Sequence, residues 1–253
     1  MIMDPWFYVA AVPAVFLVGM SKGGFGGTLA LLGVPLMALA ISPVAAAGIL
    51  LPIMIVMDAI ALLAWRGTVS RAVLLQMLPA SMVGIALGYA TSAVFPPDAI
   101  RVVIGLLSLW FVANWWFRLR GAETEAPQHR GRAAFWGACA GYGSFVAHAG
   151  GPPFQVYVAP LRLPPAHYAG TAVVFFAATN AVKLVPYYLL GQFSDENLAT
   201  SLMLLPLAPV ATLFGVWIAR RLKPELFYRI VYAFLVPVGI KLVHDGTWGL
   251  ISP

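Results

Sequence analysis

The sequence predicts an all-α polytopic membrane protein built from two inverted repeats, each a re-entrant hairpin of broken helices followed by three transmembrane helices. Hydrophobic residues make up 61% of the chain and charged residues only 9%, whereas a soluble domain is nearer half apolar and a quarter charged. Apolar stretches separate short charged loops, and many have the roughly 20 residues that a helix needs to cross the hydrocarbon core. The two halves of the chain also share a pattern of glycines and prolines.

Six uninterrupted apolar segments are predicted to span the membrane as single helices. They cover residues 44–65, 72–92, 99–117, 168–190, 197–219 and 230–244. Two other apolar regions, 3–40 and 133–161, are each interrupted, the first by the break Ser21–Gly27 and the second by the break His148–Pro153. Most of the arms beside these breaks are too short to cross the bilayer alone.

The loop charges predict the orientation. Basic residues gather in three loops, namely Arg66 and Arg71, then Arg118, Arg120, Arg130 and Arg132, then Arg220, Arg221, Lys223 and Arg229. The loop 192–197 carries Asp195 and Glu196 and no basic residue. The positive-inside rule places the basic loops in the cytoplasm and the acidic loop outside. Each broken region must then return to its side of entry, so the halves are inverted and both termini lie outside. The alternative is two full crossings per broken region and parallel halves.

Internal similarity supports a repeat. The predicted division is residues 1–117 for the first repeat, 118–132 for a cytoplasmic linker and 133–253 for the second repeat. Pro43–Gly48 matches Pro165–Gly170, and ten residues later Asp58-Ala-Ile matches Asn180-Ala-Val. Inverted repeats with interrupted segments at corresponding positions are the best sequence pointer to a transporter site.

The first break has the composition of an anion site. Glycines let the backbone approach a ligand closely, and a half-helix starting near Thr28 would point free N–H groups into the break, where they attract anions. Lys22 adds a positive charge that costs at least ~2.5 kcal/mol at membrane depth. The alternative is that Lys22 reaches a nearby interface and the glycines only allow close helix packing. The predicted substrate-binding residues are Lys22, Gly23, Gly24, Gly26, Gly27, Thr28, His148, Gly150, Gly151, Gln155, Thr171 and Lys183.

Two titratable residues are candidates for proton coupling. Asp58 lies deep in a predicted span, where a buried carboxylate needs a partner or a proton; it is either a proton-coupling group or the ion-pair partner of Lys22 or Lys183. His148 in the second break carries a proton, binds the anion or is a hydrogen-bonded packing residue. Lys183 is a second anion contact or the counter-charge of Asp58.

The polar residues Gln155, Thr171 and Thr179 lie near the second break or on the span that follows it. They contact substrate or form hydrogen bonds between helices, which is the commoner role of such residues in membranes.

Several other classes of function are disfavoured. The single cysteine, Cys139, excludes an intramolecular disulfide and a cysteine-built metal site, and we expect no metal and no cofactor. The basic residues lie in short loops, which is typical of topology signals rather than of nucleic-acid binding. No catalytic constellation is present, and Lys22-Gly23-Gly24 has no preceding strand that would make it a phosphate-binding loop.

The shared pattern resembles a known family. Each half opens on a Gly-Gly break (Gly26-Gly27 and Gly150-Gly151), continues through Pro35-Leu36 or Pro160-Leu161, and then turns into a long span. In this pattern, over nearly the whole chain, the sequence is similar to the TauE/SafE family of sulfite exporters and related permeases. The first break keeps the family's glycine run, the second keeps fewer glycines, and the usual Gly-Thr-Ser appears as Gly-Thr-Ala at 170–172. The resemblance implies transport of sulfite, sulfonates or other small organic anions across the bacterial inner membrane.

The sequence therefore predicts a secondary transporter of a small anion, working by alternating access around the two breaks. Its expected partners are the anion and the lipid bilayer; the oligomeric state is open. An anion channel of similar layout is the first alternative and would conduct far faster than a carrier. A membrane-embedded enzyme or assembly factor is the second, and it would require a reactive cluster that the few histidines, cysteines and acids do not supply.

Overall fold

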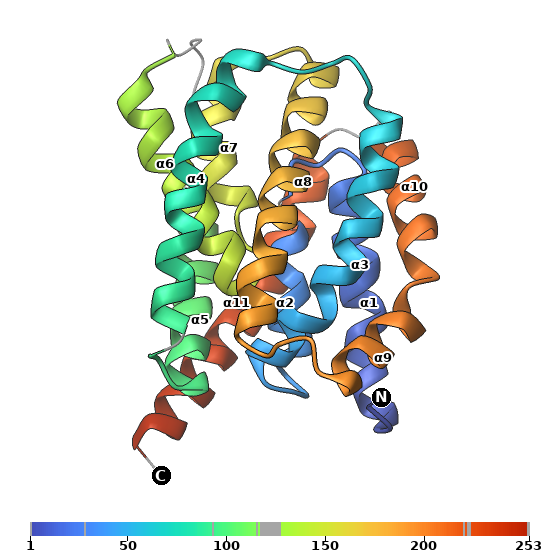
Figure 1. Cartoon of the computed structure of the whole chain (residues 1–253), viewed down its shortest axis with the longest axis vertical. Helices are drawn as coiled ribbons and strands as arrows, with labels where there is room; N and C mark the ends of the chain where they lie inside the picture. Colours follow the sequence, from blue (N-terminus) through green and yellow to red (C-terminus); the bar gives the residue numbers. More distant parts are fainter. Residues whose placement is uncertain are drawn as a thin grey trace.

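The computed structural model describes residues 2–27, 29–92, 94–114, 116, 128–219, 221 and 224–251. Within these ranges the chain is helical and has no β-strand, as the composition predicts. The elements are α1 (Pro5–Lys22), the 3₁₀ helix η1 (Leu29–Leu32), α2 (Gly33–Met37), α3 (Pro43–Ala64), α4 (Arg71–Ser92), α5 (Pro97–Asn114), α6 (Arg130–Ala147), α7 (Gly151–Val158), the 3₁₀ helix η3 (Ala159–Leu161), α8 (Pro165–Leu189), α9 (Asp195–Leu204), α10 (Leu207–Ala219) and α11 (Pro224–Ile251) (Figure 1).

Local signals fix where several helices begin. Asp4, Ser42 and Ser194 precede α1, α3 and α9, and the side chain of each accepts a hydrogen bond from a backbone N–H in the first turn. These side chains satisfy donors that would otherwise lack an intrahelical partner. A proline stands in the first turn of α1, α3 and α8, where its missing N–H costs nothing.

Among the described residues, four helices are long and apolar enough to cross a membrane, namely α1, α3, α4 and α8, and a fifth span is possible if α9 and α10 count as one. α1 belongs to the region for which mostly short arms were predicted, yet its 18 residues pass as a span. The predicted single helix over 197–219 is wrong, because the chain bends by 49° between α9 and α10. Pro206 lies at this break, and it lacks an N–H and clashes with the preceding turn.

Each interrupted region folds back toward the end of the molecule at which it began. α1 leads away from the N-terminus, and η1 and α2 return to the same end (Figure 1). α6 starts at the opposite end, and α7 returns there before α8 begins. The loop between α3 and α4 lies at the end of the molecule opposite to the loop between α8 and α9 (Figure 1). The charge pattern predicts this separation; which end faces the cytoplasm stays a prediction.

Small residues allow the closest helix pairs. α4 packs along α6, α10 along α1, and α5 along α11. A Cβ at Gly23 would collide with the backbone at Gly215, and a Cβ at Gly141 would collide with the backbone at Ser81. Lipid provides no hydrophobic drive between helices, so close van der Waals approach stabilises the bundle. Part of the high glycine content therefore serves packing.

Candidate functional site

The two breaks adopt different backbones. In the first, α1 ends at Lys22 and three glycines have positive φ, namely Gly24 (149°), Gly26 (63°) and Gly27 (78°). In the second, His148 itself takes the left-handed conformation, with φ of 53°, and caps α6. A non-glycine residue in this region is uncommon and is a pointer to function.

The helix after the first break is shorter and less regular than predicted. Thr28, the predicted start of a half-helix, lies outside the described residues. The segment after it forms the 3₁₀ helix η1 and then α2, which has only five residues. Gly33 and Pro35 in this short stretch explain the interruption, because glycine is a poor helix former and proline lacks the N–H of a helical hydrogen bond. Little helix dipole is therefore available at this break. After the second break, α7 begins at Gly151 with prolines in its first turn, where the missing N–H costs nothing.

Lys22 and Asp58 form a buried ion pair. The Lys22 Nζ lies 2.6 Å from the Asp58 Oδ1, and each residue is 3% exposed. The other carboxylate oxygen of Asp58 accepts a hydrogen bond of 2.6 Å from the Nδ2 of Asn180 on α8. Of the two partners considered for Asp58, the structure selects Lys22. Lys22 does not reach an interface as the alternative proposed, because it is enclosed by the protein.

Lys183 forms the second half of the site. Its Nζ donates to the Ser144 carbonyl oxygen at 2.9 Å and to the Ser144 Oγ at 3.0 Å, and lies 2.9 Å from the His148 Nδ1. The His148 Nε2 is 3.0 Å from the carbonyl oxygen of Ala47. Lys183 is fully buried, and no described carboxylate pairs with it. The groups that its Nζ contacts directly are therefore uncharged when His148 is neutral.

The cluster is positive when both lysines are protonated. Lys22 and Lys183 contribute two positive charges and Asp58 one negative charge. All three are buried, and water does not screen them as it does at a surface. Such an arrangement favours a bound anion, because isolated charges inside a protein require a partner.

A small cavity beside the first break reaches this cluster. Its lining residues are Ser21, Lys22, Gly26, Gly27, Ala172, Val173 and Phe176. The Phe176 ring centroid lies 5.5 Å from the Lys22 Nζ, within the range of a cation–π contact. Among the described residues, the buried Ser21 Oγ has no hydrogen-bond partner, and neither has the Asn180 Oδ1. Buried polar atoms are normally paired, so the Ser21 hydroxyl can donate to a bound anion, whereas the Asn180 Oδ1 can only accept a hydrogen bond.

The glycines of the two breaks have separate roles. Gly23 packs on Gly215 of α10, as the packing alternative expects. Gly26 and Gly27 instead face Tyr168 and Phe176 of α8, and both require positive φ. Gly24, also at positive φ, lies against Trp65 and Ala219, Gly150 against Ala140 and Phe176, and Gly151 opens α7.

The predicted polar residues Gln155, Thr171 and Thr179 form hydrogen bonds with different parts of the structure. Gln155 on α7 donates to the carbonyl oxygen of Phe25 at 3.4 Å, so it links the two breaks. The Thr171 hydroxyl accepts from the Ser70 N–H at 2.8 Å and donates to the His167 carbonyl oxygen, which ties α8 to the α3–α4 loop. Thr179 donates to the carbonyl of Phe176 within its own helix.

Sequence reasoning missed four contributors to the site, namely Ser21, Ala47, Ser144 and Asn180. Asn180 was recognisable, because it is the repeat counterpart of Asp58. The others act through common groups, a hydroxyl or a backbone carbonyl, which carry no signal in a sequence.

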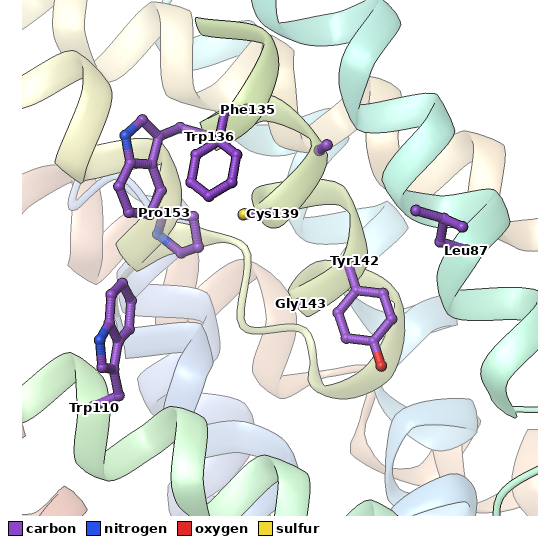
Figure 2. Close-up of a pocket in the computed structure, with 9 residues that line it drawn as sticks. Leu87, Trp110, Phe135, Trp136, Cys139, Tyr142, Gly143 and Pro153 are labelled. Atoms are coloured by element: carbon purple, nitrogen blue, oxygen red, sulfur yellow. The ribbon is translucent and has the colours of Figure 1, made fainter. Parts of the chain in front are cut away.

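A larger pocket lies elsewhere, between α4, α5 and α6 (Figure 2). Its lining includes Leu87, Trp110, Phe135, Trp136, Cys139, Tyr142 and Pro153. None of the described residues that line it is charged, so it offers an anion nothing comparable to the lysine cluster. We therefore place the candidate site at the breaks.

Comparison with known proteins identifies the family of the chain. A profile of the family described as sulfite exporter TauE/SafE matches residues 11–242 of the 253. No curated protein and no solved structure matches the chain significantly. The matched region contains both breaks, the lysine cluster and nearly all the helices. The chain belongs to the sulfite exporter TauE/SafE family, and it is a membrane anion permease rather than an enzyme.

Proposed function

We propose that this chain is a secondary transporter of sulfite or an organosulfonate in a bacterial inner membrane, and that the anion binds where the two breaks meet. The observation that supports this best is the buried positive cluster. Asp58 is already engaged by Lys22 and Asn180, so Lys183 has no described carboxylate partner. An anion entering between the breaks supplies the missing negative charge.

The proposed binding residues are those whose atoms reach the cluster or its cavity. They are Lys22, Gly26, Gly27, His148 and Lys183 from the sequence prediction, with Ser21 added. Gln155 and Asn180 support the site instead, because Gln155 donates to the Phe25 carbonyl oxygen and Asn180 donates to Asp58. The other predicted glycines and Thr171 support the backbone around them. The oxygens of a sulfite or sulfonate group can accept hydrogen bonds from the Lys22 ammonium and the Ser21 hydroxyl. Lys183 attracts the anion through its charge, because its three hydrogens already have partners.

Alternating access is proposed from the arrangement of the halves. α4 contacts α6, α10 contacts α1, and α3 contacts α8. If each helix is replaced by its counterpart in the other repeat, the same three contacts result. α1 and α6 start at opposite ends of the molecule (Figure 1), which supports inverted repeats. Asp58 and Asn180, equivalent in the repeat, meet at 2.6 Å. Rocking one half against the other would expose the cluster to each side in turn.

Flux into proteoliposomes tests the proposal. We expect saturable uptake of sulfite or a sulfonate from a panel that also includes carboxylates. The Lys22→Gln, Asp58→Asn double variant removes the ion pair without leaving an unpaired charge, so it separates function from folding. Loss of flux in this folded double variant is the expected result, and unchanged flux would exclude Lys22 from the site. Non-saturating electrical conductance would instead favour the channel alternative.

Asp58 alone is tested by Asp58→Asn. Uptake driven by a pH gradient that is unchanged in this variant would exclude Asp58 as the proton-coupling group and leave it the partner of Lys22.

A further inference from the structure

Lys183 and His148 face each other through nitrogen atoms. The Lys183 Nζ is 2.9 Å from the His148 Nδ1, and the His148 Nε2 is 3.0 Å from the Ala47 carbonyl oxygen. A carbonyl oxygen only accepts, so the Nε2 must carry a hydrogen and donate it. In the neutral imidazole the Nδ1 is therefore an acceptor. The hydrogen-bond partners thus fix the tautomer of His148.

This pair accommodates one ionising proton and not two. A protonated Lys183 donates its three hydrogens to the Ser144 carbonyl, the Ser144 Oγ and the His148 Nδ1. If the proton moves to the Nδ1, the imidazolium donates to the Lys183 amine across the same contact. A second proton would set two N–H donors against each other at 2.9 Å.

The pair can also lose its proton without leaving an unsatisfied group. The neutral amine of Lys183 keeps two donors, for the Ser144 carbonyl and the His148 Nδ1. The Ser144 hydroxyl, whose hydrogen rotates freely, then turns to donate to the amine lone pair. Both protonation states therefore satisfy the buried polar atoms.

The surroundings make the protonated state depend on an anion. The charged groups that act on the pair are Lys22 of α1 and Asp58 of α3, and Asp58 is already paired with Lys22. On α8, the uncharged Tyr187 lies with its ring centroid 6.0 Å from that of His148. A buried cation without a counter-ion is costly. A bound anion would stabilise the proton, and by reciprocity the proton would stabilise the anion.

We propose that Lys183 and His148 form a single-proton site, so that one proton accompanies each anion through the protein. This inference rests on the proposed anion transport. When the site is loaded, the proton resides on the Nζ of Lys183 or the Nδ1 of His148. When the anion leaves, the proton leaves with it, because the pair then has no counter-ion.

Lys183→Arg provides the sharpest test, since the guanidinium does not lose its proton in proteins. We would measure methanesulfonate flux together with internal pH in proteoliposomes, and methanesulfonate affinity between pH 5 and 9. Methanesulfonate keeps one charge over this range, so its own titration does not contribute. The wild type is expected to move one proton per anion. The affinity of the wild type for methanesulfonate should fall by about tenfold for each unit that the pH rises above the range in which the pair titrates. Linkage of anion binding to one proton requires this slope.

In Lys183→Arg we expect anion binding that no longer varies with pH, and no proton movement with the anion. Thr179→Val is the matched control, because it changes a buried polar residue on the same helix outside the pair; it should keep the wild-type proton count. If Lys183→Arg does not fold, the wild-type measurements decide. Wild-type flux without protons and with pH-independent affinity would overturn the single-proton site while leaving anion transport intact. Absence of flux for every anion would instead contradict the proposed function.

Discussion

At each of the two breaks, a titratable residue of the break pairs with a residue of the span that follows, but the two pairs differ in charge. At the first, the residue in the break is a cation, Lys22, and the span that follows provides an acid, Asp58, at 2.6 Å. At the second, the residue in the break is a base, His148, and the span that follows provides a cation, Lys183, at 2.9 Å. The first pair is neutral, whereas the second is positive or neutral according to its proton. The similar sequence frameworks thus hold one ion pair without net charge and one pair whose charge depends on its proton.

The largest expected effect is a difference in protein stability between variants of the Lys22–Asp58 pair and of the Lys183–His148 pair. Lys22→Gln leaves the buried Asp58 carboxylate without its counter-ion and should destabilise the protein by about 3–5 kcal/mol. Lys183→Gln leaves no unpaired acid, and its cost should be about 1–3 kcal/mol for the groups left without a partner. Thermal unfolding midpoints in detergent would rank the two variants. Equal losses, or a larger loss for Lys183→Gln, would contradict the larger contribution of the Lys22–Asp58 ion pair to stability.

A second substitution that restores stability to Lys22→Gln would show that the unpaired charge causes the loss. Adding Asp58→Asn to Lys22→Gln removes the unpaired charge, so most of the lost stability should return. A double variant as unstable as Lys22→Gln alone would show that packing around Lys22, and not its charge, stabilises the first break.

A smaller effect tests whether anion flux depends on the positive φ of Gly27 in the first break. Gly27→Ala forces a side chain into the left-handed region, at a cost of about 1–2 kcal/mol, and pushes against the Phe176 ring that covers Lys22. Gly67→Ala is the matched control, because Gly67 has φ of 80° with open space around it. Both should lower the unfolding midpoint, but only Gly27→Ala should reduce anion flux. Equal flux in the two variants would remove Gly27 from the site.

The smallest effect concerns the tether of the first break. The Trp65 Nε1 donates to the Gly23 carbonyl oxygen at 2.9 Å, and Trp65→Phe removes this bond at a cost of about 0.5–1.5 kcal/mol. Tyr187→Phe is the counterpart near the second break, because the Tyr187 hydroxyl donates to the Phe145 carbonyl oxygen at 2.6 Å. We expect modest and similar shifts in unfolding midpoint. A loss of transport in Trp65→Phe at unchanged stability would mean that Gly23 binds substrate directly.

The sequence by itself determined the membrane class, the positions of both breaks and the family. Composition and apolar length decide these, because a bilayer permits a surface with few charges. It also identified Lys22, Asp58, His148 and Lys183 as the residues of interest, because charges within apolar segments are costly and need a purpose.

Only the tertiary structure decided which of these groups pair and which helices break. Lys22 and Asp58 are 36 residues apart and Asp58 and Asn180 are 122 apart, so local sequence contains no information on their contact. Several helices keep an internal proline, such as Pro52 in α3 and Pro79 in α4, whereas the chain bends at Pro206. The physical reason is the same in both cases. Neighbouring helices determine whether a freed backbone group or a buried charge finds a partner, and those neighbours come from distant parts of the chain.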